Sequence, residues 1–291
     1  MLGSFDEEEP DVAEVLRYTA FSDDPAGGNP AGVVLDATGL TSAQMLAVAA
    51  EVGFSETAFL APGDGDALDV RYFSPRAEVS FCGHATIASA VAHAERHGPG
   101  PLRYRTAAGE VGVRTRRDEA GAWLATLTSV PPTTAPLADD DLAALLAVLG
   151  WAPDELDPAL PPRVAYAGAW HPVLAARTRD RLARLAYDLD VLGELMAPRG
   201  WTTVDLVWRE DPLTVWARNP FPPGGVVEDP ATGAAAAALG GYLRELGLVE
   251  LPARVTVHQG DDLGRPSVLL VDVPADPAAG IDVTGTAVRM A

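Results

Sequence analysis

The chain lacks lysine altogether, so all 21 basic residues among its 291 are arginine. A Schiff base with a substrate or with pyridoxal phosphate needs a lysine amine, and so does a Walker A phosphate loop. These enzyme classes are therefore excluded. No G-x-G-x-x-G motif follows an expected strand, so a Rossmann dinucleotide site has no support. Cys82 is the one cysteine, which excludes an intrachain disulfide and fits a reducing compartment.

Positive charge and long apolar runs are also scarce. The net charge of -20 opposes binding to a phosphate backbone and argues against a nucleic-acid role. No apolar run approaches the roughly 18 residues that cross a bilayer. Asp6 and Glu7–Glu9 stand where a signal peptide carries basic residues. We therefore expect a globular, cytoplasmic protein without nucleic-acid or membrane partners, long enough for two domains.

Two similar segments, one in each half, place a polar turn before a helix of very small residues. The first is Phe81-Cys82-Gly83-His84-Ala85-Thr86, and the second is Glu228–Gly233 followed by Ala234–Ala238. A helix N-terminus has unpaired N–H groups and partial positive charge, and it attracts anions. Two such ends facing each other across a cleft would hold a small acidic substrate. Close packing in a core explains the alanines, but it does not explain the ionisable residues in the turns, which favour acid–base chemistry.

Strands outnumber helices in both halves, and each half has one small-residue helix without a clear polar face. Such a helix must be buried, so the pattern predicts a curved sheet around one central helix, built twice. Residues 131–136, Pro-Pro-Thr-Thr-Ala-Pro, are the strongest linker candidate. The fold is expected to begin at residues 16–19. Helices are expected near 41–51, 83–96, 139–149, 180–197 and 230–246, and strands near 31–35, 55–60, 68–72, 102–107, 110–116, 122–128, 163–168, 171–176, 202–209, 213–218, 253–259, 266–273 and 281–289.

Glu56 is a carboxylate at the start of an otherwise apolar strand. Burial raises the pKa of a carboxyl group, which suits it to exchanging protons near neutral pH. The open alternative is that Glu56 caps the strand or faces solvent. Ser55 lies in Gly53-Phe54-Ser55-Glu56-Thr57, which misses the G-x-S-x-G nucleophile elbow at its last residue. The broken elbow disfavours a serine hydrolase.

Histidine spacing gives no support for a metal site. His93 and His97 are four residues apart, but a zinc protease motif needs its glutamate directly after the first histidine. Glu95 is one position too late, and the segment reads as a solvated helix end. Asp139–Asp141 is interpreted as charge at a helix N-terminus.

Six segments resemble the phenazine biosynthesis PhzF-like family, in that family's order and over about residues 14–290. The pair G-H-x-T and D-P-A-T-G, with S-E-T ahead of it, is specific to the family. The segments are Asn29-Pro30, Phe54–Thr57, Arg71–Pro75, Phe81–Thr86, Glu228–Gly233 and Gln259-Gly260 with Gly264–Ser267.

The resemblance implies an α+β fold of the diaminopimelate-epimerase type, with two pseudo-symmetric lobes, each a curved, mostly antiparallel sheet around a central helix. The lobes would span residues 14–130 and 131–280, and residues 281–291 would form a terminal strand that can return to the N-terminal lobe. The resemblance also implies a homodimer that uses no cofactor and no metal, with its site between the lobes.

In the best-understood members, a glutamate moves a proton between carbons of trans-2,3-dihydro-3-hydroxyanthranilate. The resemblance thus implies a cofactor-independent isomerase of a small carboxylate-bearing metabolite. Glu56 matches the proton-carrying glutamate, and His84 and Asp229 match the residues that bind substrate and assist. The further residues expected to contact substrate are Asn29, Ser55, Cys82, Gly83, Gly233 and Ala234.

Two departures from the family pattern concern the substrate. Ala234 replaces a serine whose hydroxyl contacts substrate in phenazine-type members, and Cys82 replaces an alanine. The related two-cysteine racemases carry a second cysteine near residues 229–233, and its absence here excludes a two-thiol racemase. Two alternatives stay open: an anion-binding protein on the same fold that has lost the chemistry, and a serine hydrolase through Ser55.

Overall fold

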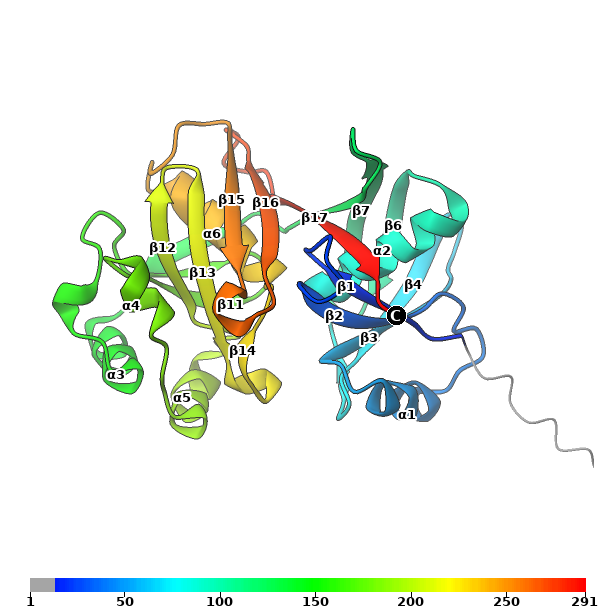
Figure 1. The fold of residues 1–291 in the computed structure, drawn as a ribbon, viewed down its shortest axis with the longest axis horizontal. Coiled ribbons are helices and arrows are strands. Elements are labelled where there is room, and N and C mark those ends of the chain that lie inside the picture. The colour runs from blue at the N-terminus through cyan, green and yellow to red at the C-terminus, as the bar shows by residue number, and fades with distance from the viewer. Residues whose placement is uncertain (1–13) are drawn as a thin grey trace, which may run out of the picture.

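A computed structural model describes residues 14–291, and the acidic lead-in expected over residues 1–13 lies outside the described residues. Two lobes lie side by side, and each wraps strands around one helix (Figure 1). The central helices are α2 (Gly83–His97) and α6 (Gly233–Glu245). Most residues of both helices are buried, as the small-residue pattern predicted. The fold is therefore α+β with one enclosed helix in each half. No helix within residues 14–291 has the length and apolar character needed to cross a bilayer.

The strands of the N-terminal lobe form a closed ring around α2. Each strand pairs with the next, and the last strand of the chain pairs with the first and closes the ring. Helix α1 (Ser42–Val52) packs outside the ring, and Thr41 begins it with the expected capping box. In order around the ring the strands are β1 (Leu16–Ala20), β2 (Asn29–Val34), β3 (Glu56–Pro62), β4 (Ala67–Phe73), β6 (Pro101–Thr106), β7 (Gly109–Arg117), β8 (Trp123–Thr128) and β17 (Asp282–Arg289). The short strand β5 (Glu78–Val79) pairs antiparallel with the end of β4.

The C-terminal lobe repeats this order of elements. Its parallel pairs, β11 with β12 and β13 with β15, correspond to β2 with β3 and β4 with β6. In the matched pairs Val173 lies opposite Asp205 as Ala31 lies opposite Glu56, so Asp205 occupies the position of Glu56. The strands are β10 (Arg163–Tyr166), β11 (Trp170–Ala175), β12 (Asp205–Asp211), β13 (Thr214–Phe221), β14 (Val226–Asp229), β15 (Ala253–Gln259) and β16 (Ser267–Val273).

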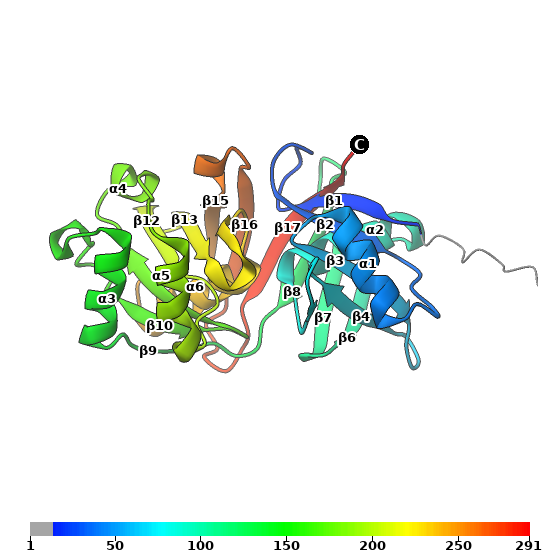
Figure 2. The ribbon, with the colours of Figure 1, turned by 90° about the horizontal axis from the view of Figure 1, so that it is seen from below.

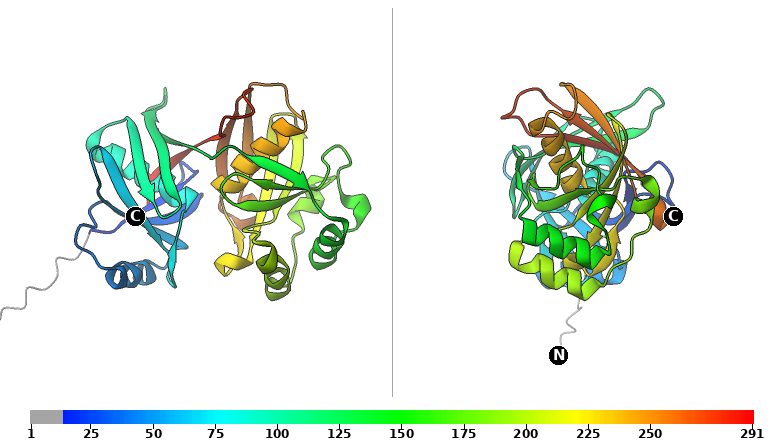
Figure 3. Two further views of the ribbon diagram at one scale, coloured as in Figure 1. Left: turned by 180° about the vertical axis from the view of Figure 1, so that it is seen from behind. Right: turned by 90° about the vertical axis from the view of Figure 1, so that its left-hand side faces the viewer.

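The two lobes are tied together by strands that cross between them. β17 pairs with β16 of the C-terminal lobe and then with β8 and β1 of the N-terminal lobe, and it crosses the middle of the molecule in Figures 2 and 3. The segment that follows β8 crosses in the opposite direction, from the N-terminal lobe to the C-terminal lobe. The linker candidate over residues 131–136 also contains a strand that was not expected: residues Thr133–Pro136 form β9, which pairs with β10. Proline is tolerated there because β9 pairs on one side alone.

Several short helices cover the outer face of the C-terminal sheet. They are α3 (Asp139–Leu149), α4 (Arg179–Ala183) and α5 (Leu189–Met196). Four 3-10 turns lie in the connections of this lobe: η1 (Pro153–Glu155), η2 (Ala197–Arg199), η3 (Pro222–Gly224) and η4 (Asp261–Leu263). The single helix predicted over 180–197 was wrong. The chain leaves the helical conformation at Arg184, and Asp188 starts a second helix by accepting hydrogen bonds from the N–H groups of Asp190 and Val191.

Candidate active site

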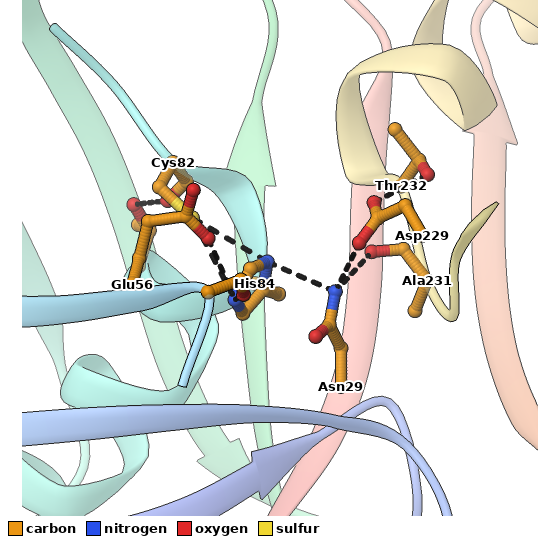
Figure 4. Close-up of polar contacts among 9 residues, drawn as sticks. Asn29, Glu56, Cys82, His84, Asp229, Ala231 and Thr232 are labelled. Carbon is orange, nitrogen blue, oxygen red and sulfur yellow. Dashed lines mark hydrogen bonds and ion pairs between the residues drawn. The ribbon is translucent and has the colours of Figure 1, made fainter. Parts of the chain in front are cut away.

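The N-termini of α2 and α6 meet between the lobes, as the paired polar turns predicted. A Cβ atom on Gly83 would lie 3.7 Å from the Cα atom of Gly233. Neither helix has a side-chain cap at its start, so N–H groups of both first turns remain available. Figure 4 shows the polar side chains that gather around this junction.

Asn29, at the start of β2, connects the two lobes. Its Nδ2 donates to Oδ1 of Asp229 at 2.7 Å and to the carbonyl oxygen of Ala231 at 3.1 Å, both in the C-terminal lobe. Nδ1 of His84 lies 3.1 Å from the same Nδ2 atom. Because Asp229 and the Ala231 carbonyl are acceptors, the amide must face them with its nitrogen, and we assign Nδ1 of His84 as an acceptor. Asn29 thus joins His84 to Asp229.

His84 is the second residue of α2 and is buried. Its Nε2 atom lies 3.4 Å from Oε2 of Glu56 and 3.3 Å from Oγ of Ser55. With Nδ1 facing the Asn29 amide, the proton of the neutral imidazole sits on Nε2 and points toward the Glu56 carboxylate. Glu56 is the first residue of β3, and only 12% of its side chain is exposed. The Glu56 carboxylate and the His84 imidazole therefore face each other across a short, largely buried contact.

Asp229 is the acid on the other side of the junction. Oδ2 accepts from the Thr232 hydroxyl at 2.6 Å, while Oδ1 accepts from Asn29. Burial raises the pKa of Asp229 to about 6, and the nearby His84 and the hydrogen bonds from Thr232 and Asn29 counteract the rise. A buried carboxyl group with this pKa can hold or release a proton near neutral pH.

Gln259 supports the turn that carries Asp229. Its Nε2 donates to the Asp229 carbonyl at 2.7 Å and to Oγ1 of Thr232 at 3.0 Å, and its Oε1 accepts from the Thr232 N–H at 3.0 Å. Gln259 and Thr232 belong to segments that the sequence singled out, but no role was predicted for either. Only their folding against one turn reveals the support.

Cys82 and Ala234 lie beside the junction. Sγ of Cys82 is 3.4 Å from Nδ1 of His84, and burial raises the pKa of the thiol well above its ordinary value, with the negative charge of Glu56 as the next cause. The thiol is therefore protonated at neutral pH and is a poor nucleophile. Ala234 follows Gly233 as His84 follows Gly83, so α6 has a methyl group where α2 has an imidazole.

Glu56, Cys82 and His84 place one donor atom each within 4.8 Å of one another, a set that zinc can bind. A histidine bound to metal through Nε2 donates its Nδ1 proton to an acceptor. Here Nδ1 faces the Asn29 amide nitrogen, which is a donor. The surroundings of His84 therefore suit proton transfer better than metal binding.

The other histidines lie outside this cluster. His93 and His97 stack on each other near the C-terminal end of α2, with ring centroids 4.4 Å apart, and His258 stacks on Trp216. His171 is buried in β11, where its Nδ1 bonds to the Thr203 hydroxyl.

The two lobes, each with a sheet around one helix, and the facing helix ends define the diaminopimelate-epimerase type of fold. A protein from Agrobacterium radiobacter K84 described as a probable proline racemase shares the fold, with a TM-score of 0.65 at 15% identity over 95% of this chain and 90% of that one. The chain belongs to the PhzC-PhzF family of phenazine biosynthesis-like proteins, whose model matches residues 18–291.

Relatives in this family are named as isomerases. An uncharacterized isomerase from Bacillus subtilis is 29% identical over 95% of this chain and 96% of its own length. The trans-2,3-dihydro-3-hydroxyanthranilate isomerase of Pseudomonas fluorescens is 31% identical over 92% of this chain and 94% of its own. A Bacillus anthracis phenazine biosynthesis protein of the PhzF family superposes with a TM-score of 0.86 at 27% identity, over 95% and 96% of the two chains. The chain is an isomerase of this family.

Proposed function

We propose that the protein moves a proton between two carbons of a small carboxylate-bearing metabolite, with Glu56 as the single proton carrier. The observation that supports this most is the contact between the Glu56 carboxylate and Nε2 of His84, at 3.4 Å, beside two facing helix N-termini. One carboxylate can remove a proton from one carbon and return it to another on the same face, provided water is excluded. The burial of His84 and Asp229 supports that exclusion.

The facing helix ends supply the binding half of the proposal. The substrate carboxylate would accept hydrogen bonds from the N–H groups of the first turns at Gly83 and Gly233. His84 would hold Glu56 in place through Nε2, and Asp229 would bind a polar substituent of the substrate from the opposite lobe. Asn29 fixes both groups relative to each other.

The substrate class follows from the relatives and from two residues of this chain. The Pseudomonas fluorescens relative acts on trans-2,3-dihydro-3-hydroxyanthranilate, according to its name. We propose a related cyclic or amino-acid-like carboxylate for this protein. Ala234, the second residue of α6, has no hydroxyl, so a substrate group that needs a hydroxyl partner at that position is disfavoured.

A serine hydrolase is the second candidate, because Oγ of Ser55 lies 3.3 Å from Nε2 of His84. A hydrolytic triad needs a carboxylate on the other imidazole nitrogen. Here the carboxylate of Glu56 shares Nε2 with Ser55, and Nδ1 faces the Asn29 amide. Covalent labelling of Ser55 by a fluorophosphonate probe would support the hydrolase, and we expect no labelling.

The test of the proposed function is a panel of small cyclic and amino-acid-like carboxylates incubated with the protein in heavy water. NMR reads the exchange of carbon-bound hydrogen. We expect at least one compound to gain deuterium and to yield an isomer. Tight binding of a carboxylate with no exchange in any bound compound would instead favour the anion-binding alternative.

We further propose a cytoplasmic homodimer with lobes over residues 14–130 and 131–280, on the family resemblance. Light scattering behind a sizing column would test the dimer: the mass should be twice the chain's 30.4 kDa.

A further inference from the structure

Arg265 reaches from the C-terminal lobe to the turn of the N-terminal lobe that precedes Asn29. It lies between η4 and β16. Its Nε donates to the carbonyl oxygen of Gly28 at 2.7 Å, and its Nη2 donates to the carbonyl oxygen of Gly27. The Gly28 N–H in turn donates to the Pro266 carbonyl at 3.0 Å. The Gly27–Gly28 turn is therefore held by hydrogen bonds to the other lobe.

This turn has no room for another residue type at Gly28. The φ of Gly28 is 65°, and an added Cβ atom would lie 2.4 Å from the carbonyl oxygen of Ala20. A Cβ atom on Gly27 would lie 2.7 Å from the Pro266 carbonyl oxygen. The fit is close on both sides, so the position of the turn depends on the loop that carries Arg265 and Pro266.

The charge of Arg265 is not used in an ion pair. No carboxylate of residues 14–291 forms a salt bridge with it, whereas the buried Arg218 pairs with Glu228. Burial lowers the pKa of the Arg265 guanidinium, which marks an unfavourable place for a charge. A partly buried arginine without a carboxylate acts here as a rigid, forked donor for two carbonyl groups.

Asn29 follows this turn directly and joins His84 to Asp229. We propose that Arg265 is a positioning residue of the proton-transfer site: it holds the Gly27–Gly28 turn, and through it the Asn29 amide, against His84 and Asp229. The inference rests on the proposed function for its effect on turnover, but its effect on His84 can be measured without any substrate. A shift of about 1 Å in a catalytic group commonly lowers turnover by about a hundredfold.

The test compares R265Q, R265K and N29A with the double variant R265Q/N29A, with R254Q as the control. Arg254 forms an exposed bidentate pair with Asp272 in the same lobe. We expect R265Q and N29A each to lower kcat by about ten- to a hundredfold. The double variant should be no slower than the slower single variant, because Arg265 is proposed to act through the Asn29 amide, which N29A already removes. R265K keeps the charge but not the fork, and it should fall between wild type and R265Q. R254Q should behave as wild type.

The second measurement is the NMR titration of the His84 imidazole, assigned among the five histidines by comparison with H84Q. R265Q and R265K should both change the His84 signals, and R254Q should not. Losses of kcat that add in the double variant, or unchanged His84 signals in R265Q and R265K, would overturn the inference. If the wild type exchanges no carbon-bound hydrogen, the proposed function fails, and the His84 signals still decide the role of Arg265.

Discussion

Asp229 is held by two side-chain donors that both favour its ionised form. Asn29 donates to Oδ1 and Thr232 donates to Oδ2, while burial raises the pKa to about 6. Because both donors bond to the carboxylate oxygens, the site stabilises the ionised form of Asp229. Proton exchange should therefore rise with pH through about 6.

We predict that N29A, which removes one donor to Asp229, moves the acid inflection in the pH profile of kcat/KM to higher pH. Removal of a hydrogen bond to the carboxylate makes ionisation harder, so the apparent pKa rises. The pH profile of deuterium exchange measures it, with the exposed variant R254Q as the reference. An inflection that stays in place or moves to lower pH would contradict the assignment to Asp229.

Asp205 is a second buried acid, and it occupies in the C-terminal lobe the position of Glu56. Asn219 donates to its Oδ1 at 3.1 Å, and its Oδ2 has no hydrogen-bond partner. Asn219 also accepts from Thr203, whose hydroxyl bonds to Nδ1 of His171, so four buried polar side chains form one network. Burial raises the pKa of Asp205 to about 7.

We predict that the free energy of unfolding of the wild type falls as pH rises from 4 to 8, and that this fall is absent in D205N. The folded-state pKa of Asp205 lies above its unfolded value of 3.8, so the folded protein favours the protonated carboxyl group. The stabilisation that this gives is fully present below about pH 4 and is lost as the pH rises through about 7. Each pKa unit corresponds to about 1.4 kcal/mol, so the loss amounts to a few kcal/mol. Urea unfolding of wild type and D205N at several pH values measures it. Parallel curves for the two proteins would contradict the prediction.

The residues of the site could be read from the sequence in part. Glu56, His84 and Asp229 each stood in a distinctive turn, and the structure brings them into one cluster through Asn29. The supports of the cluster could not be predicted, because Gln259, at the end of β15, and Arg265, in the loop that follows β15, come close to the cluster only in the folded chain. The network of Asp205 was missed as well, since its members come from three separate segments, at residues 171, 203–205 and 219, and no local pattern links them.

At the scale of elements, α2 and α6 meet at two glycines, Gly83 and Gly233. Gly83 has no side chain to fill the space in front of Gly233, and a Cβ atom there would make an ordinary contact at 3.7 Å. The small-residue character of both helices predicted their burial. The break between α4 and α5 was missed because an aspartate inside an amphipathic segment can lie within a helix or begin one.

We predict that G83A keeps the fold and weakens carboxylate binding. Alanine is favoured over glycine in a helix by up to about 1 kcal/mol, and the new methyl group has room. The methyl group would occupy the space proposed for the substrate carboxylate, so the dissociation constant should rise while the melting temperature stays or increases. Calorimetric titration with a carboxylate from the panel, beside thermal unfolding, tests both parts. Unchanged affinity in a folded G83A would place the carboxylate elsewhere.

For the whole molecule, the crossing strand β17 joins the lobes. Gly285 in β17 lies against Phe21, whose backbone has a positive φ of 65° and whose carbonyl accepts from the N–H of Val268 in the other lobe. A Cβ atom on Gly285 would lie 2.2 Å from the Phe21 ring. The repeated order of elements could be expected from the sequence, but the exchange of strands between lobes depends on pairings of residues far apart in the chain.

We predict that G285A lowers the free energy of unfolding by about 1–3 kcal/mol, the usual cost of overpacking a filled site. The matched control is G112A in β7, where an added Cβ atom meets nothing within 4 Å. Denaturant unfolding should show a clear loss for G285A and little change for G112A. Equal stabilities would mean that the Phe21 contact does not hold β17 in place.

The central claim is that Glu56 carries the proton, and deuterium exchange by the E56Q variant tests it most directly. Glutamine keeps the shape and the hydrogen bonds of the side chain but cannot accept the proton. On a carboxylate that the wild type isomerises in heavy water, we predict that E56Q exchanges carbon-bound hydrogen at least ~10²-fold more slowly, with nearly unchanged affinity. An E56Q variant that exchanges hydrogen at close to the wild-type rate would contradict the account and leave His84 or Cys82 as the proton carrier.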